Sequence, residues 1–126
     1  MPNHKVNYSY IERIVSSPQF RNMQDKTQLF YSAPKRQVRT RLTHTMEVKV
    51  LARDIGARIN AGSSGVQVDL DLIDAIALAH DIGHTPFGHA GEYAMQKCFD
   101  PEFTHYRQSL RVVEKLENDG EGLNLT

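Results

Sequence analysis

The sequence has a single cysteine, Cys98, among its 126 residues, so it cannot form an internal disulfide, and a reducing, cytoplasmic location is expected. Its longest unbroken apolar run spans five residues, 75–79, far short of the ~20 that a transmembrane helix needs. The first residues also lack the apolar stretch of a signal peptide. No membrane contact is therefore expected.

Neither sign of charge dominates, because 15 basic residues balance 15 acidic ones, so the sequence gives no strong indication of nucleic-acid binding. Glycine and proline are also sparse, with 8 and 5 copies, and 40% of the residues are apolar. This composition is typical of one ordinary globular domain and excludes a disordered chain. The unusual count is six histidines.

Apolar residues that recur at steps of three and four predict an all-α fold. The clearest helix is expected over residues 38–60, and its expected inward face consists of His44, Val48, Leu51, Ile55 and Ile59. Asp69 or Asp71 is expected to cap a second helix. The expected inner stripe of that helix is Leu72, Ile73, Ile76, Ala77 and His80. Antiparallel packing of the two helices would bring His44 and His80 together.

The helical patterns in the rest of the sequence are weaker, and proline and glycine residues indicate where these helices end. A helix is expected to end at Ser17-Pro18, a turn at 32–34, and further helices over 88–99 and 105–117. The last of these has Leu110, Val113 and Leu116 as its expected stripe. Residues 65–69 give the only short alternating, strand-like pattern, and Thr126 stands where a helix N-cap would be expected.

The segment 79–92 contains three histidines and two carboxylates. His80 and Asp81 are adjacent at a predicted helix end, so both side chains can reach one ion, and imidazole with carboxylate suits a borderline divalent cation. A lone inward histidine such as His44 is more often a hydrogen-bonded core residue than a ligand. The pair together with His44 favours a metal, because burying Asp81 without a cation is costly.

His89 and Glu92 lie three residues apart and share a helix face, an arrangement in which a carboxylate can orient an imidazole for acid–base catalysis. The alternative is a surface ion pair, which spacing alone favours. Gly88 and Gly91 favour the catalytic interpretation, because a glycine lets a substrate approach the backbone.

Three further polar residues could support such a site. His84 lies on the loop between the His80-Asp81 pair and His89, where it could support the metal ligands, donate a hydrogen bond to a phosphate, or be solvated. Arg41 precedes His44 by three residues, and an arginine beside a metal suggests a phosphate-like substrate. His105, taken alone, is more often a capping or surface residue.

Four segments, 39–48, 80–92, 103–109 and 122–126, together resemble the HD-domain deoxynucleoside triphosphate triphosphohydrolases, the dGTPase-like group. The resemblance implies a helical HD-domain bundle that holds one divalent ion, with Mn2+ or Mg2+ expected first and other transition metals compatible. By matched position, His44, His80 and Asp81 are metal ligands. The family's fourth ligand, an aspartate, has no match in this sequence, so incomplete coordination and weak activity are expected.

The same resemblance implies roles for the other residues. His89, Glu92 and His84 match catalytic positions, and Arg41 and His105 match substrate-binding positions. The implied reaction converts a deoxynucleoside triphosphate to deoxynucleoside and triphosphate. The expected organisation is one HD domain over 1–126, the N-terminal part of a longer architecture, with an N-terminal segment of about 1–35 and an HD core over 36–126. Family members often form homo-oligomers.

Two other functions remain compatible with these residues. The chain could be a non-catalytic HD module that binds a nucleotide or serves a regulatory partner. It could also be an HD phosphodiesterase that acts on another phosphate ester. The product formed from a deoxynucleoside triphosphate separates the three.

Overall fold

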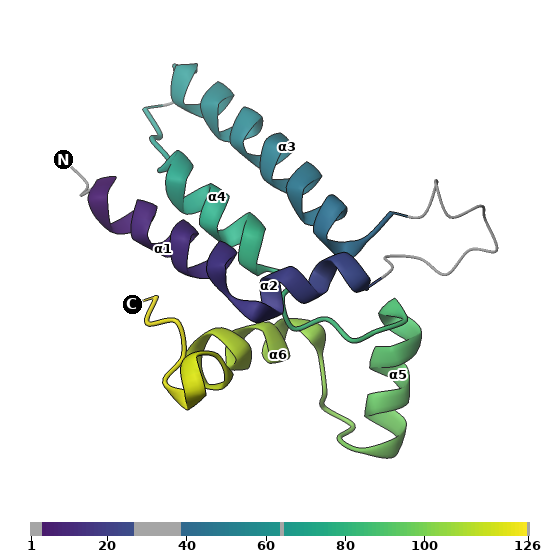
Figure 1. Cartoon of the computed structure of the whole chain (residues 1–126). Coiled ribbons are helices and arrows are strands. Elements are labelled where there is room, and N and C mark those ends of the chain that lie inside the picture. Colours follow the sequence, from purple (N-terminus) through teal and green to yellow (C-terminus); the bar gives the residue numbers. More distant parts are fainter. Residues whose placement is uncertain (1–3, 27–38, 64, 126) are drawn as a thin grey trace.

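The computed structural model describes residues 4–26, 39–63 and 65–125, and every regular element within these ranges is a helix (Figure 1), which confirms the all-α prediction. The longer helices are α1 (His4–Ser16), α2 (Pro18–Asn22), α3 (Arg41–Ala61), α4 (Leu70–Ala79), α5 (Gly88–Cys98) and α6 (His105–Arg111). Short 3-10 turns cover Met23–Asp25 and Asn118–Gly120, and a π-helical turn covers Val112–Leu116. Within the described ranges, no helix is long and apolar enough to cross a membrane.

Side-chain caps explain where the helices begin. Ser17 accepts a hydrogen bond from the Phe20 amide ahead of Pro18, and Thr40 accepts one from Thr43. The choice left open between Asp69 and Asp71 is resolved, because the Asp69 carboxylate accepts from the amides of Asp71 and Leu72. Each such cap stabilises a helix by about 1 kcal/mol.

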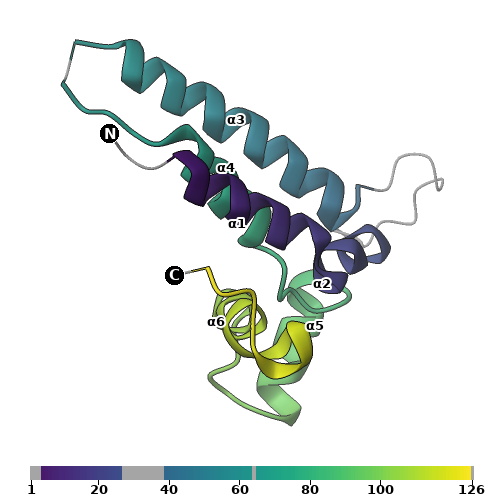
Figure 2. The ribbon, with the colours of Figure 1, turned by 60° about the vertical axis from the view of Figure 1, so that its left-hand side comes forward.

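Helix α4 lies between α1 and α3, and these helices run side by side in both views (Figures 1 and 2). The hydrophobic core lies along α4 and continues into the turns below it. Its buried members are Ile14, Phe20, Met23, Ala75, Leu78, Ile82 and Val112.

The predicted inner faces of the helices are partly wrong. On α3, Leu51 and Ile55 are 63% and 59% exposed, whereas Thr45 and Gly56 are buried. The reason is close packing against α4: a Cβ on Gly56 would lie 2.7 Å from Ile73 Cδ1. Gly56 therefore faces α4, Thr45 contacts the sulfur of Met23 at 3.8 Å, and Leu51 and Ile55 are left exposed.

The same error of register occurs on the other two helices. On α4, Ala77 is buried as predicted, but Leu72 and Ile76 are exposed, and Ala75 and Leu78 are buried in their place. At the C-terminal end of the chain, the exposed residues are Leu110 and Leu116, and the buried ones are Ser109 and Val112.

Other expectations concern chain ends and loops. The described residues 65–69 form a loop and no strand, and helix 105–117 is divided into α6 and the π-helical turn. The expected turn at 32–34 and the expected cap at Thr126 lie outside the described residues.

Candidate functional site: two histidine clusters around Asp81

The first cluster brings together His44 from α3 and His80 and Asp81 from the end of α4. The ring nitrogens Nε2 of His44 and His80 lie 3.8 Å and 3.6 Å from Asp81 Oδ2. The two imidazole rings meet edge to face, with centroids 5.7 Å apart. The convergence expected from antiparallel packing of α3 and α4 is therefore observed.

His80 is fixed in one tautomer by its surroundings. Its Nδ1 lies 2.6 Å from the carbonyl oxygen of Ala77, which can only accept a hydrogen bond. The Nδ1–H therefore donates to this carbonyl, and Nε2 is the nitrogen that faces Asp81, where the neutral form of the ring offers its lone pair. Metal-ligating histidines are usually held in this way.

Asp81 is buried, and its counter-charge in the structure is Arg41. Arg41 Nη1 donates to Asp81 Oδ2 over 3.0 Å, and both side chains are almost fully buried. Burial alone raises the pKa of Asp81, but the charges of His80 and Arg41 and the hydrogen bond from Arg41 outweigh it and lower the pKa. Asp81 therefore does not need a metal as its counter-charge, contrary to the expectation from the sequence, because the guanidinium of Arg41 already supplies a positive charge.

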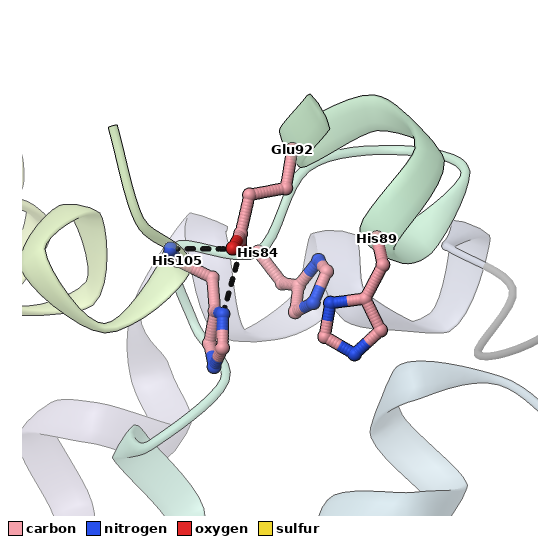
Figure 3. A group of neighbouring side chains, drawn as sticks. All are labelled: His84, His89, Glu92 and His105. Carbon is pink, nitrogen blue, oxygen red and sulfur yellow. Dashed lines mark hydrogen bonds and ion pairs between the residues drawn. The ribbon is translucent and has the colours of Figure 1, made fainter. Parts of the chain in front are cut away.

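The second cluster consists of His84, His89, Glu92 and His105, which point toward one another from a loop, α5 and the start of α6 (Figure 3). One potential ligand atom from each of the four lies within 4.8 Å of those of the others. The clusters meet at Asp81, where His105 Nε2 lies 4.0 Å from Oδ1. His89 is the exposed member of the group.

Glu92 orients His105 in the structure. Its Oε2 accepts hydrogen bonds from the His105 backbone amide over 3.0 Å and from Nδ1 over 2.7 Å (Figure 3). Among the described residues, Glu92 forms its hydrogen bonds with His105. The expectation that Glu92 aligns His89 is therefore corrected, because Glu92 aligns His105 instead. The spacing of His89 and Glu92 on one helix face was right, but α6 supplies the partner.

His84 is buried, and its Nδ1 lies 3.2 Å from the carbonyl oxygen of Thr85. Because that carbonyl only accepts, the neutral ring carries its proton on Nδ1 and has a bare lone pair on Nε2. Within the described part of the chain, this Nε2 is buried without a hydrogen-bond partner. Burial and the charge of Arg41 lower the pKa of His84, which keeps the ring neutral.

Comparison with known proteins agrees with this geometry. The family model of the HD domain matches residues 41–125. The chain belongs to the HD-domain family. The matched segment contains all the residues of both clusters.

Relatives of this HD domain are deoxyguanosinetriphosphate triphosphohydrolase-like proteins. The relative from Desulfatibacillum aliphaticivorans is 51% identical over 115 residues, which are 91% of this chain and 31% of the relative. The relative from Caldanaerobacter subterraneus subsp. tengcongensis is 50% identical over 115 residues, with 91% and 32% covered. The relative from Sinorhizobium medicae is 46% identical over 120 residues, with 91% and 28% covered. The chain thus spans about three tenths of the length of the curated relatives it matches.

The first cluster of this HD domain fits a single divalent ion. Ligand atoms that share an ion through bonds of ~2.1 Å lie roughly 3–4 Å apart. The separations of 3.8 Å and 3.6 Å from Asp81 Oδ2 agree with this value. In His80, the bare Nε2 supplies the lone pair that an ion requires.

Three features of the chain could not be foreseen from the sequence. Lys26 donates from Nζ to the carbonyl oxygen of His84 over 2.9 Å, and the hydroxyl of Ser109 bonds the turn around Asp81. Ser109 lies in one of the four family-like segments, whereas Lys26 has no signal in the sequence. The open space expected at Gly91 is filled, since a Cβ there would lie 2.0 Å from the carbonyl oxygen of Pro86.

Proposed function

We propose that this HD domain carries the hydrolytic site of a dGTPase-like protein and cleaves a deoxynucleoside triphosphate to deoxynucleoside and triphosphate. The observation that carries the proposal is the position of Asp81 between the two clusters. Its Oδ2 faces His44 and His80, and its Oδ1 lies 4.0 Å from Nε2 of His105. A metal-binding face and a proton-transferring face thus adjoin one carboxylate.

His44, His80 and Asp81 would hold the divalent ion. Two imidazoles with one carboxylate favour a transition ion such as Mn2+ over Mg2+, which prefers oxygen ligands. When bound, such an ion supplies positive charge to a phosphate oxygen and lowers the pKa of water. Arg41 adds positive charge beside Asp81, and this charge favours an anionic phosphate at the same place.

Proton transfer is assigned to His105 and His89. Glu92 holds the Nδ1–H of His105, so its Nε2 can accept the proton that water loses as it attacks the α-phosphorus. The bond between the α-phosphorus and the 5′ oxygen then breaks, and the 5′ oxygen takes a proton from His89. His84, with its bare Nε2, is assigned to accept a hydrogen bond from water or substrate at the reacting phosphate.

Two features support the dGTPase-like assignment over the other candidates. The relatives' names point to deoxyguanosine triphosphate as the substrate. The presence of the Glu92–His105 pair beside the metal cluster favours an enzyme over a binding module, because a carboxylate-held imidazole serves proton transfer. We include α1 and α2 in the same domain, because both contribute to the core ahead of the family match.

The test is product analysis with dGTP and Mn2+. Deoxyguanosine and triphosphate are the expected products, whereas dGMP with pyrophosphate would indicate another HD phosphohydrolase, and binding without turnover would indicate a regulatory module. His89→Ala and His105→Ala are expected to abolish turnover and to retain Mn2+. The matched control is Arg58→Ala, which removes an exposed ion pair with Asp54 on α3 and leaves turnover unchanged.

A further inference from the structure

Ser109 is a buried serine of α6 whose hydroxyl contacts both sides of Asp81 in sequence. It accepts a hydrogen bond from the Gly83 amide over 3.0 Å. Its own proton can go to the carbonyl oxygen of His80 at 3.0 Å or to that of His105 at 2.9 Å. The hydroxyl therefore ties Gly83, the second residue after Asp81, to α6, and it also ties His80, the residue before Asp81, when its proton goes to the His80 carbonyl.

The backbone of the turn lies directly against α6. A Cβ added to Gly83 would lie 2.2 Å from the Ser109 nitrogen and 2.4 Å from the carbonyl carbon of Gln108. These obstacles are main-chain atoms, which cannot rotate away as side chains can. The absence of a side chain at Gly83 brings the turn close enough for the hydroxyl of Ser109 to reach it.

The bonds of Ser109 also bear on the second cluster. Ser109 lies four residues after His105, on the same helix, and it anchors that helix to the turn that carries Asp81. The separation of His105 Nε2 and Asp81 Oδ1, 4.0 Å, therefore depends on how α6 is seated. Only 6% of Ser109 is exposed, so water does not replace its hydroxyl freely.

We propose that Ser109 is a positioning residue of the metal site, which fixes the direction of Asp81 and its distance from His105 by holding the turn 80–83 onto α6. The inference rests on the proposed function, since it concerns the same ion. Removing the hydroxyl leaves the Gly83 amide without its acceptor and frees the turn. Outer partners of metal ligands typically change metal affinity roughly 10–100-fold when they are removed.

The experiment compares the Mn2+ affinity of the whole chain with that of Ser109→Ala and Ser17→Ala. Ser17 is a matched control, because it is also a buried serine whose hydroxyl bonds backbone at both sides, to Ile14 and from Phe20, away from both clusters. Both variants are expected to lower the melting temperature. Only Ser109→Ala is expected to raise the Mn2+ dissociation constant, by about tenfold or more.

Ser109→Cys is the second variant, in case the alanine variant does not fold. A thiol fills a similar space but is a weak hydrogen-bonding group, so the same rise in the dissociation constant is expected. Unchanged affinity in a folded Ser109 variant, or an equal loss in Ser17→Ala, would overturn the positioning role and leave the proposed function standing. Failure of the unaltered chain to bind Mn2+ would instead overturn the proposed function together with this inference.

Discussion

At the scale of residues, Asp81 is the point on which the chemistry of the site converges. It faces a buried guanidinium and two imidazoles through Oδ2 and a third imidazole through Oδ1. The lowered pKa of Asp81 keeps it ionised at neutral pH, so the carboxylate can serve both as partner of Arg41 and as a metal ligand.

Asp81→Asn should destabilise the fold strongly in the absence of metal. The change keeps the shape of the side chain but removes the charge opposite Arg41, and breaking a buried ion pair from one side costs about 3–5 kcal/mol. Urea denaturation measures the loss. Asp54→Asn, which affects an exposed pair with Arg58, should cost about 1 kcal/mol or less. Equal small losses in both variants would show that the Asp81–Arg41 pair contributes little.

Glu92→Gln tests the link to His105 through its pH dependence. Burial alone raises the pKa of Glu92, but the hydrogen bonds from the His105 side chain and backbone outweigh it, and the pKa lies below the ordinary 4.5. A carboxyl with a lowered folded-state pKa stabilises the fold above its unfolded pKa, and this contribution disappears as the pH falls through the folded-state value.

The variant should therefore be less stable than the parent by about 1.5–3 kcal/mol at pH 7, as expected for a hydrogen bond to a charged group. This difference in stability between the variant and the parent should shrink as the pH falls below the unfolded pKa of Glu92 and through its folded-state pKa. Urea denaturation of both proteins at pH 7 and at pH 3 provides the comparison. A difference that stays constant between the two would contradict a stabilising, ionised Glu92.

Much of the first cluster could be predicted from the sequence, because His80 and Asp81 are adjacent and His44 lies on the neighbouring helix. The hydrogen-bond partner of Glu92 could not be predicted from the sequence. Spacing shows that His89 and Glu92 share a face, but it does not show which side chain another helix brings to that face. His105 reaches Glu92 only because α6 begins beside α5 in space.

At the scale of elements, capping residues explain where the helices begin. Hydrophobicity alone does not explain which side of each helix is buried. The apolar stripe of α3 is expected to face inward, yet Gly56 packs against α4 and Thr45 packs against Met23. Two helices can pack closely only where the residues between them are small. The spacing of apolar residues in a sequence does not indicate how close the neighbouring helix will be.

Gly83→Ala tests the close contact between the turn and α6. The new Cβ would overlap main-chain atoms of Ser109 and Gln108, so α6 must move, and a loss of about 3 kcal/mol is expected. Gly62→Ala is the control, because Gly62 is exposed, has a negative φ of −77° and offers a nearest contact of 3.3 Å. Thermal unfolding of both variants gives the comparison. Similar stabilities would mean that α6 yields easily at this place.

At the scale of the whole molecule, the site lies where two groups of helices meet. Helices α1, α3 and α4 run side by side, and the turn after α4 leads to α5 and α6 (Figures 1 and 2). His44 and His80 come from the first group, and Glu92 and His105 from the second. The fold therefore assembles the site only when both groups are seated on the turn 80–83.

Anomalous scattering from crystals grown with Mn2+ would show directly whether His44, His80 and Asp81 hold one divalent ion. We expect one strong peak within about 2–2.5 Å of Nε2 of His44, Nε2 of His80 and Oδ2 of Asp81. We also expect that the peak disappears in His80→Ala and persists in His89→Ala. A peak among His84, His89, Glu92 and His105 instead, or no peak at any histidine, would contradict this assignment of the ligands.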